Sequence, residues 1–208
     1  MPRKTKRNTR GKIVSAAWKL FYEQGYEDTT IEDIVFESET SKGSFYHYFE
    51  SKDALLGTLS TLFDEKYQEL METMPEDMDA ITALSFLNRE LFAMIDASIS
   101  LDLLARLLSS QLITHGEKHL LDRNRFYFRL LRQIVMQGQR RGELRRDMSV
   151  NEITRAYAMW ERALMYDWCL SGGEYSLSKY SADMTPLFLR SFRAEESGAS
   201  ALPVETDG

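Results

Sequence analysis

The chain has few of the residues that constrain a fold covalently or interrupt a helix. Its 208 residues include one cysteine and four prolines, which excludes an internal disulfide and leaves long segments free to form helices. No apolar run is long enough to span a bilayer, and the basic N-terminus lacks the apolar segment of a signal peptide. We therefore expect a cytoplasmic protein with no membrane partner.

Patterns typical of enzymes and metal sites are also missing. No glycine-rich phosphate loop follows a strand pattern, and no nucleophile elbow occurs. His115 and His119 have the spacing of two zinc ligands on one helix face, but no third ligand lies near them in sequence. Cys169 is expected to be a small, buried apolar residue. We predict no catalytic residue, no metal site, no cofactor and no enzymatic activity.

Helical periodicity, by contrast, runs through most of the chain. Apolar residues recur at spacings of three and four, and no segment shows strand alternation, so the expected fold class is all-α. A linking helix is expected over 52–74, ended by Pro75, and the tail 195–208 is expected to be disordered. The pattern then predicts helices over 79–97, 101–114, 118–141, 149–171 and 176–193.

The N-terminal quarter of the chain predicts three short helices. Residues 8–24 carry one apolar stripe, which Gly25 ends. Thr29 and Glu32 have the spacing of a capping box at the start of a second helix. A third helix lies around Phe45, and the second and third would form a helix-turn-helix.

The run from Thr40 to Leu55 has the chemistry of a helix laid against DNA. Hydroxyl, Tyr and Lys side chains are common partners of phosphate oxygens, and short side chains at a helix N-terminus let the backbone approach base edges. A plain surface turn is the alternative. The net charge of −6 argues against a nucleic-acid partner if it is spread evenly, but an arm free of acids at the N-terminus carries Arg3, Lys4, Lys6, Arg7, Arg10 and Lys12.

The order of these residues resembles the N-terminal signature of the TetR family of bacterial transcriptional regulators. The resemblance covers residues 8–56 and is carried by Gly25-Tyr26, Thr29-Thr30-Ile31, Ile34, the run from Ser41 to Phe49, and Ser51-Lys52. It implies a homodimer with a DNA-binding domain over 1–53, including the basic arm, and a helical effector-binding and dimerisation domain over 54–194. The implied function is a ligand-responsive, sequence-specific repressor of a palindromic operator, released by a small, largely apolar effector.

The resemblance also assigns roles on the DNA side. Lys42, Ser44 and His47 would lie nearest the bases, and Gly43 would let the backbone approach the groove. Phosphate contacts are implied for Thr30, Ser41, Tyr46, Tyr48 and Lys52. Two positions depart from the family pattern: Glu39 stands where the turn usually carries Gly, and Val35 where Ala is usual. A non-Gly residue with positive φ costs about 1 kcal/mol, and Glu39 also brings a negative charge near phosphates.

The later helices suggest a dimer interface and a ligand pocket. The segment 149–171 is apolar on two sides, so one side is expected to face a partner subunit together with 176–193, although both could pack within one subunit. The expected interface residues are Tyr157, Leu164, Trp168, Leu187 and Phe188. The expected ligand contacts are Phe92, Phe128 and Trp160, with an anionic ligand or a solvated face as alternative explanations for Arg125, Arg129 and Arg132.

Two other functional classes remain open from the sequence. A DNA-organising protein without a ligand would use the same first domain for binding set mainly by salt. A ligand-binding module without operator specificity would bind an apolar compound and show no sequence preference, and Glu39 is the feature that favours it.

Overall fold

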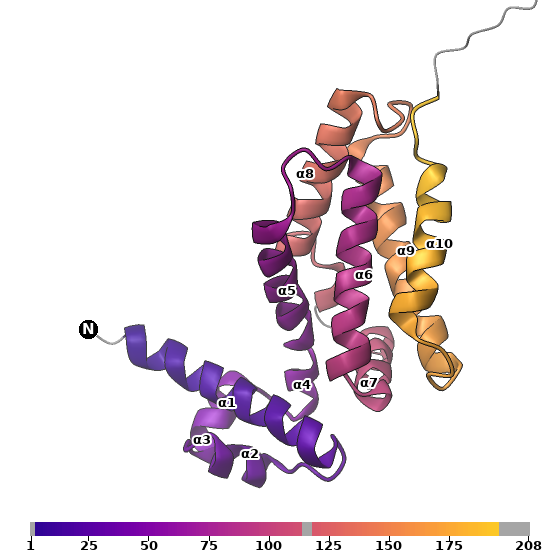
Figure 1. Ribbon diagram of the computed structural model, residues 1–208. Coiled ribbons are helices and arrows are strands. Elements are labelled where there is room, and N and C mark those ends of the chain that lie inside the picture. Colours follow the sequence, from indigo (N-terminus) through magenta and orange to yellow (C-terminus); the bar gives the residue numbers. More distant parts are fainter. Residues whose placement is uncertain (1–2, 114–117, 196–208) are drawn as a thin grey trace, which may run out of the picture.

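The protein is an assembly of helices, in keeping with the all-α prediction. The computed structural model describes residues 3–113 and 118–195, with side chains from residue 9 onward. Over this part of the chain, the β structure is limited to an isolated bridge between Leu144 and Arg193. Figure 1 shows a small N-terminal head of three helices, joined through α4 to a longer bundle. None of the helices described is both long and apolar enough to cross a membrane.

The head consists of α1 (Arg3–Gln24), α2 (Ile31–Glu37) and α3 (Lys42–Tyr48). The backbone of the predicted basic arm is helical from Arg3, and the side chains of residues 3–8 lie outside the described part. The capping box of α2 falls one residue later than predicted, on Thr30 and Asp33. Thr29 is instead buried, and its hydroxyl donates to the Gly25 carbonyl at 2.7 Å. Side chains from all three helices close the core of the head: Ile13, Ala17, Phe21, Ile34, Phe45 and Phe49.

The predicted linking helix over 52–74 is in fact two helices, α4 (Asp53–Leu56) and α5 (Leu59–Thr73). The Thr58 amide donates to the Leu55 carbonyl, three residues back, and so interrupts the α-helical bonding pattern. The Thr58 hydroxyl also donates to Leu55 O and accepts the Trp18 indole N–H at 2.9 Å. This break therefore anchors α1 of the head to the start of the bundle.

The bundle is built from α5 with α6 (Ala80–Ser98), α7 (Leu101–Ile113), α8 (Phe126–Arg141), α9 (Val150–Leu170) and α10 (Leu177–Arg190). Helices α6 and α10 lie side by side in Figure 1. Asp96 on α6 fixes the start of α10, because its carboxylate accepts the backbone amides of Leu177 and Ser178. The predicted tail beyond residue 195 lies outside the described part.

The helix predicted over 118–141 is also divided. A short 3-10 helix, η1 (His119–Leu121), precedes α8, which begins only at Phe126. Arg125 has extended backbone, and its guanidinium turns back to Asp64 on α5. This ion pair, which periodicity cannot reveal, delays the start of α8.

Candidate DNA interface and effector region

The N-terminus of α3 lies at the surface of the head. Ser41 caps the helix, its hydroxyl accepting the Ser44 amide at 3.1 Å and lying 3.0 Å from the Ser44 hydroxyl. Ser41 and Gly43 are exposed. Small polar residues therefore form the end of α3 that the sequence predicts to enter a groove.

The two sides of α3 differ in character. Phe45 is fully buried, whereas Lys42, Tyr46 and His47 are exposed. The Tyr46 ring meets Phe45 edge-on, which supports an exposed phenol on an apolar base. Tyr48 is half-buried, with its ring edge-on to His47. The fold thus presents Lys42, Tyr46 and His47, three of the side chains predicted to contact DNA, at the outer surface of α3.

Lys42, predicted to lie near the bases, forms an ion pair with Glu32 on α2. The pair raises the pKa of Lys42 and lowers the pKa of Glu32, mainly through their shared hydrogen bond. Both side chains remain largely exposed, so a phosphate or a base acceptor can replace the carboxylate.

The turn between α2 and α3 contains a strained residue. Glu39 has φ of 51°, in the left-handed region, as expected from its place in the turn. Its carboxylate lies 3.8 Å from the Lys12 ammonium on α1 and is otherwise open to solvent. The turn therefore tolerates Glu at the cost of backbone strain and of a negative charge on this surface.

Two predicted phosphate contacts have roles inside the head. Thr30 caps α2, and its hydroxyl donates to Asp33 at 2.6 Å. The Lys52 ammonium donates to the carbonyls of Tyr26 at 2.6 Å and Thr29 at 2.8 Å, and it lies 4.2 Å from the centre of the Tyr26 ring. An ammonium has three donors, and a third carbonyl, that of Glu27, lies 3.4 Å away. The phosphate contact predicted for Lys52 is not supported, because its donors already hold the loop after α1.

A buried carboxylate is the main polar feature of the bundle, and the sequence did not single it out. Glu161 on α9 is only 2% exposed, and donors from four helices surround it. Asn88 Nδ2 lies 3.0 Å from Oε1, the Tyr157 hydroxyl 2.9 Å from Oε1, and the Tyr67 hydroxyl 3.3 Å from Oε2, which also accepts from Tyr127. Glu161 falls within an apolar stripe of α9, four residues after Tyr157, and an acid at such a position is the signal that could have identified it.

Burial and hydrogen bonding act on Glu161 in opposite directions. Desolvation dominates and raises its pKa, although the surrounding donors partly offset the effect. The Tyr157 hydroxyl has one proton and two acceptors within reach, Glu161 and the Leu84 carbonyl at 2.8 Å. A protonated Glu161 can donate to the Tyr157 oxygen while Tyr157 donates to Leu84, which satisfies every group. The geometry therefore accommodates a protonated Glu161, and burial shifts its pKa in that direction.

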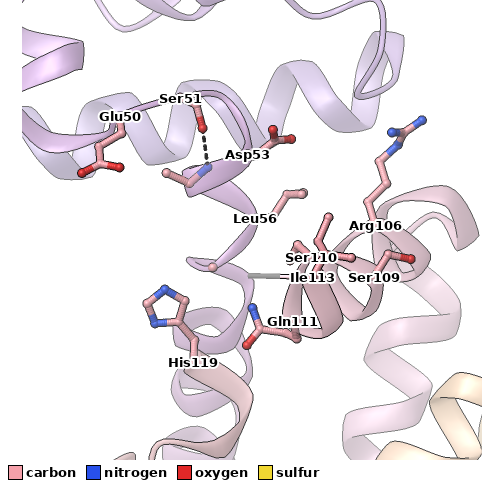
Figure 2. A pocket seen from close by; sticks show the side chains of 12 residues that line it. Glu50, Ser51, Asp53, Leu56, Arg106, Ser109, Ser110, Gln111, Ile113 and His119 are labelled. Atoms are coloured by element: carbon pink, nitrogen blue, oxygen red, sulfur yellow. Dashed lines mark hydrogen bonds between the residues drawn. The ribbon is translucent and has the colours of Figure 1, made fainter. Parts of the chain in front are cut away.

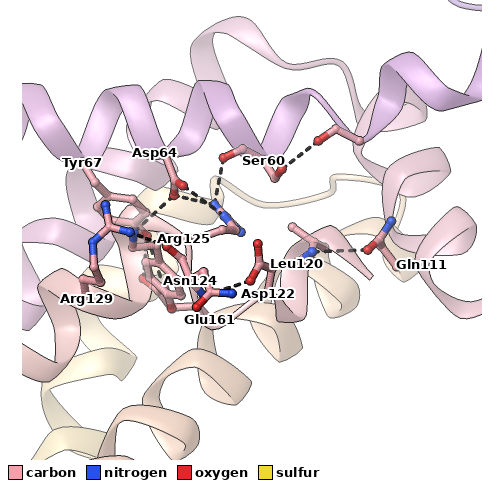
Figure 3. A network of polar contacts seen from close by, with 12 residues as sticks. Ser60, Asp64, Tyr67, Gln111, Leu120, Asp122, Asn124, Arg125, Arg129 and Glu161 are labelled. Atoms are coloured by element: carbon pink, nitrogen blue, oxygen red, sulfur yellow. Dashed lines mark hydrogen bonds and ion pairs between the residues drawn. The ribbon is translucent and has the colours of Figure 1, made fainter. Parts of the chain in front are cut away.

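Arg125 lies beside this network and ties η1 and α8 to α5 (Figure 3). Its guanidinium donates to Asp64 at 2.7 Å and to the Ser60 carbonyl at 2.8 Å. Arg129 donates instead to the Asn124 carbonyl. Arg132 lines a separate cleft between α8 and α9. The three arginines predicted on one helix face therefore have three different environments.

The three predicted ligand contacts have different environments. Phe92 is fully buried in the core, whereas Trp160 stacks on Phe188 and donates to Thr185 at 3.1 Å. Phe128 alone of the three lines the cleft that contains Arg132. The helical spacing of aromatic residues therefore predicts core positions better than it predicts a ligand site.

Three predicted dimer residues also belong to the core of a single subunit. Tyr157, Leu164 and Trp168 are buried without any partner chain, so they have almost no surface to offer. Leu187 on α10 is half-exposed, and Phe188 is partly buried beside Trp160. The prediction that these three residues contact a partner subunit is therefore wrong.

A pocket of about 680 Å³ lies between the head and the bundle (Figure 2). Asp53 and Gly57 line it from α4 and its end, and Arg106 and His119 line it from the bundle. Arg106 on α7 reaches Glu27 in the head, with Nη2 2.5 Å from Oε1, and lies 5.0 Å from the centre of the Tyr26 ring. The head is thus attached to the bundle both through α4 and through Arg106.

His119 contacts the break between α4 and α5. A Cβ atom built on Gly57 would lie 2.5 Å from His119 Cδ2, so the histidine ring fills the space beside this glycine. The histidine pair considered for zinc includes His115, which lies outside the described residues. Among the residues described, no group of three or more His, Cys, Asp or Glu side chains has the arrangement of a metal site.

Comparisons with known proteins agree with this architecture. The family model "Bacterial regulatory proteins, tetR family" matches residues 13–59. An uncharacterised HTH-type transcriptional regulator of Lactococcus lactis is 52% identical over 46 residues, 22% of this chain and about a quarter of that protein. The repressor DhaR of Mycobacterium sp. strain GP1 is 24% identical over 165 residues, 74% of this chain and 79% of its own length. The structure of the Thermus thermophilus repressor FadR with lauroyl-CoA superposes with a TM-score of 0.69 at 21% identity, covering 93% of this chain and 98% of FadR.

Proposed function

The chain belongs to the TetR family of bacterial regulatory proteins, a family of ligand-responsive, DNA-binding transcriptional regulators, and on that premise we propose that it is a homodimeric repressor whose two heads bind a palindromic operator. The outer surface of α3 is the observation that carries the proposal. It combines capped serine hydroxyls, an exchangeable lysine and an exposed phenol around Gly43. Such groups contact phosphates and base edges in a major groove. Its place of action would be the cytoplasm, where the DNA is.

Gly43 gives the proposal its sharpest support. A Cβ at this position would meet only the Ser41 hydroxyl, at the ordinary distance of 3.8 Å. The fold therefore has room for a side chain that the sequence does not use. Close approach of another molecule to the backbone of α3 accounts for the glycine.

The dimer interface that we propose lies on the outer faces of α9 and α10. Tyr166 is 45% and Leu170 72% exposed in the single subunit. On α10, Tyr180 and Leu187 are also exposed. Exposed apolar side chains on two neighbouring helices are suited to a second copy of the same surface. Phe188 would support this surface from behind, through its stack on Trp160.

Coupling between an effector and the DNA is proposed to pass through η1. Leu120 lines the small cavity beside Glu161, Leu121 lines the cleft between α8 and α9, and His119 touches Gly57 at the break between α4 and α5. A ligand that displaces η1 would therefore displace the connection to the head. In a dimer, a small change at this point alters the separation of the two α3 helices.

Selection of bound sequences from a random pool of double-stranded DNA tests the function. The purified full-length protein should enrich a palindrome at physiological salt, with half-sites one helical turn or a multiple apart. A Lys42→Ala variant should relax the preference at one base pair of each half-site if Lys42 reads a base edge. Binding that depends on salt but not on sequence would indicate a DNA-organising protein instead. No binding at any salt would leave a ligand-binding module.

A further inference from the structure

A cleft between α8, α9 and η1 concentrates positive charge. Its volume is about 550 Å³, within the range of small-molecule sites. Arg132 comes from α8, Arg155 and Arg162 from α9, and Arg123 from the segment between η1 and α8. Four guanidinium groups around one opening produce a local field that attracts an anion, although the chain as a whole is acidic.

The described acids make no direct ion pair with these arginines. None of the four arginines forms an ion pair with any acid whose side chain is described. Glu152, the acid in the lining, is engaged at the start of α9, where Oε2 accepts both the amide and the hydroxyl of Ser149 at 2.7 Å. Arg162 is half-buried, and burial lowers its pKa. A partly desolvated guanidinium without a bound acceptor is a group prepared for an anion.

An unused hydrogen-bonding group points to the same cleft. Thr154 lines it and is only 3% exposed, and its hydroxyl has no hydrogen-bond partner in the described protein. Buried hydroxyls are almost always paired, because losing water without gaining a partner is unfavourable. The hydroxyl itself has almost no accessible surface, so a ligand atom in the cleft would supply the missing partner only after a small shift of the side chains that cover Thr154.

The remaining wall of the cleft is apolar. Leu121 and Met159 are largely exposed there, with Phe128 and Ala158 behind them. Arg162 and Ala158 also line the cavity of about 30 Å³ beside Glu161, so the two spaces adjoin. A ligand that fits both the basic and the apolar parts of the cleft has an anionic end and an apolar end.

We propose that this cleft binds the effector and that the effector is an amphipathic anion, with a carboxylate or phosphate group held by Arg162 and Arg132 and an apolar part against Phe128 and Leu121. The assignment of this ligand as the effector rests on the proposed regulatory function. Binding in the cleft does not, and it can be measured without DNA. The largely apolar effector expected from the sequence is thereby replaced by one with a defined charge.

Titration calorimetry on the full-length protein tests the charge requirement. The probes are octanoate, octyl phosphate, octylamine and 1-octanol, which share one apolar chain and differ in the head group. The two anions should bind at least tenfold more tightly than the alcohol and the amine, and their affinity should fall as salt increases. Equal binding of octanol and octanoate would overturn the proposal.

Variants locate the site. Arg162→Gln should weaken octanoate binding about tenfold. Arg190→Gln, which removes the same charge from an exposed position on α10 outside the cleft, should bind octanoate as the unaltered protein does. If Arg162→Gln binds octanoate as tightly as the unaltered protein, the assignment of the binding site to this cleft is wrong. Operator affinity without any probe is measured in parallel, and its absence would reject the regulatory function without affecting the calorimetric result.

Thr154→Val separates a ligand contact from a structural role. The substitution removes an unpaired buried hydroxyl and keeps the shape of the side chain, so it should raise the Tm of the ligand-free protein. The same variant should bind octanoate about fivefold more weakly, because the hydroxyl can no longer bond to the anion. A variant that is stabilised and binds octanoate with unchanged affinity would exclude Thr154 from the site and remove this support.

Discussion

Gly43 distinguishes a requirement of the fold from a requirement of binding. Alanine fits at this position without a clash, and in a helix it is favoured over glycine by about 1 kcal/mol. We predict that Gly43→Ala raises the free energy of unfolding by up to about 1 kcal/mol and yet weakens operator binding at least tenfold. Urea unfolding and titration with a labelled operator measure the two effects. Unchanged operator affinity would show that the backbone of α3 does not approach the groove closely.

Glu39 combines strain and charge, and two substitutions separate them. Glycine relieves the positive φ, so Glu39→Gly should stabilise the protein by about 0.5–1 kcal/mol. Glu39→Ala removes the same carboxylate and keeps the strain, so it should give no such gain. Both variants should bind the operator more tightly at low salt, because a negative charge leaves the DNA-facing surface. Equal stability of the two variants in urea unfolding would contradict the role of the backbone.

Residue patterns in the sequence predicted the outer surface of α3 and the strained turn, because local spacing determines both. They did not predict Lys52 or Glu161. Lys52 folds back onto carbonyls more than twenty residues away, and Glu161 meets donors from α5, α6 and α8. An apolar stripe on a helix predicts that a position faces inward. It does not predict which polar side chains from other helices will lie beside that position.

The junction between α4 and α5 is the element in which the connection to the head is most constrained. A methyl group at Gly57 would meet the His119 ring at 2.5 Å, so Gly57→Ala should destabilise the protein by about 1–3 kcal/mol and weaken operator binding by shifting α4. His119→Ala creates space at the same point. The double variant should recover both stability and affinity relative to Gly57→Ala, which thermal unfolding and operator titration would show. Additive losses in the double variant would mean that the two residues act independently.

At the level of helices, periodicity predicted their order and most of their extents. It failed where a tertiary contact overrides the local pattern, at the Thr58 break held by Trp18 and at Arg125, which is drawn to Asp64. It also failed to choose between the two apolar sides of α9. Both sides have the spacing of a buried stripe, and only the packing of α7, α8 and α10 against α9 decides which one remains at the surface.

Across the whole protein, Glu161 links stability to pH. Because burial raises its pKa above the ordinary value of 4.5, the folded protein retains a proton that the unfolded chain has released. The contribution is fully favourable below pH 4.5 and is lost as the pH rises through the folded pKa. We predict that the stability of the unaltered protein, measured relative to Glu161→Gln, falls as the pH increases from 4.5 toward neutrality. Chemical unfolding at a series of pH values measures this difference, and a flat difference would show that Glu161 ionises normally.

The carboxylates with lowered pKa values, among them Asp79 and Asp96, act in the opposite direction and at lower pH. Their contributions are common to both proteins and cancel in the difference. Arg125 and Arg162 line the same small cavity as Glu161, and Arg125 is already paired with Asp64. An anion bound near Arg162 would weaken the stabilisation that this cation gives to the charged form of Glu161. The difference in stability between the unaltered protein and Glu161→Gln should therefore fall further with increasing pH when octanoate is present.

Three attachments limit how the head can move. It is joined covalently through α4, held by Arg106 on Glu27 and Tyr26, and held by the Trp18 indole on the Thr58 hydroxyl. A small body tied to a larger one at several points moves with it and has little freedom of its own. Motion at the start of the bundle would therefore carry α3 along and would not lift the head away by itself. In a dimer, the two heads would be related by symmetry, so the distance between the two α3 helices would follow the movement of one bundle relative to the other.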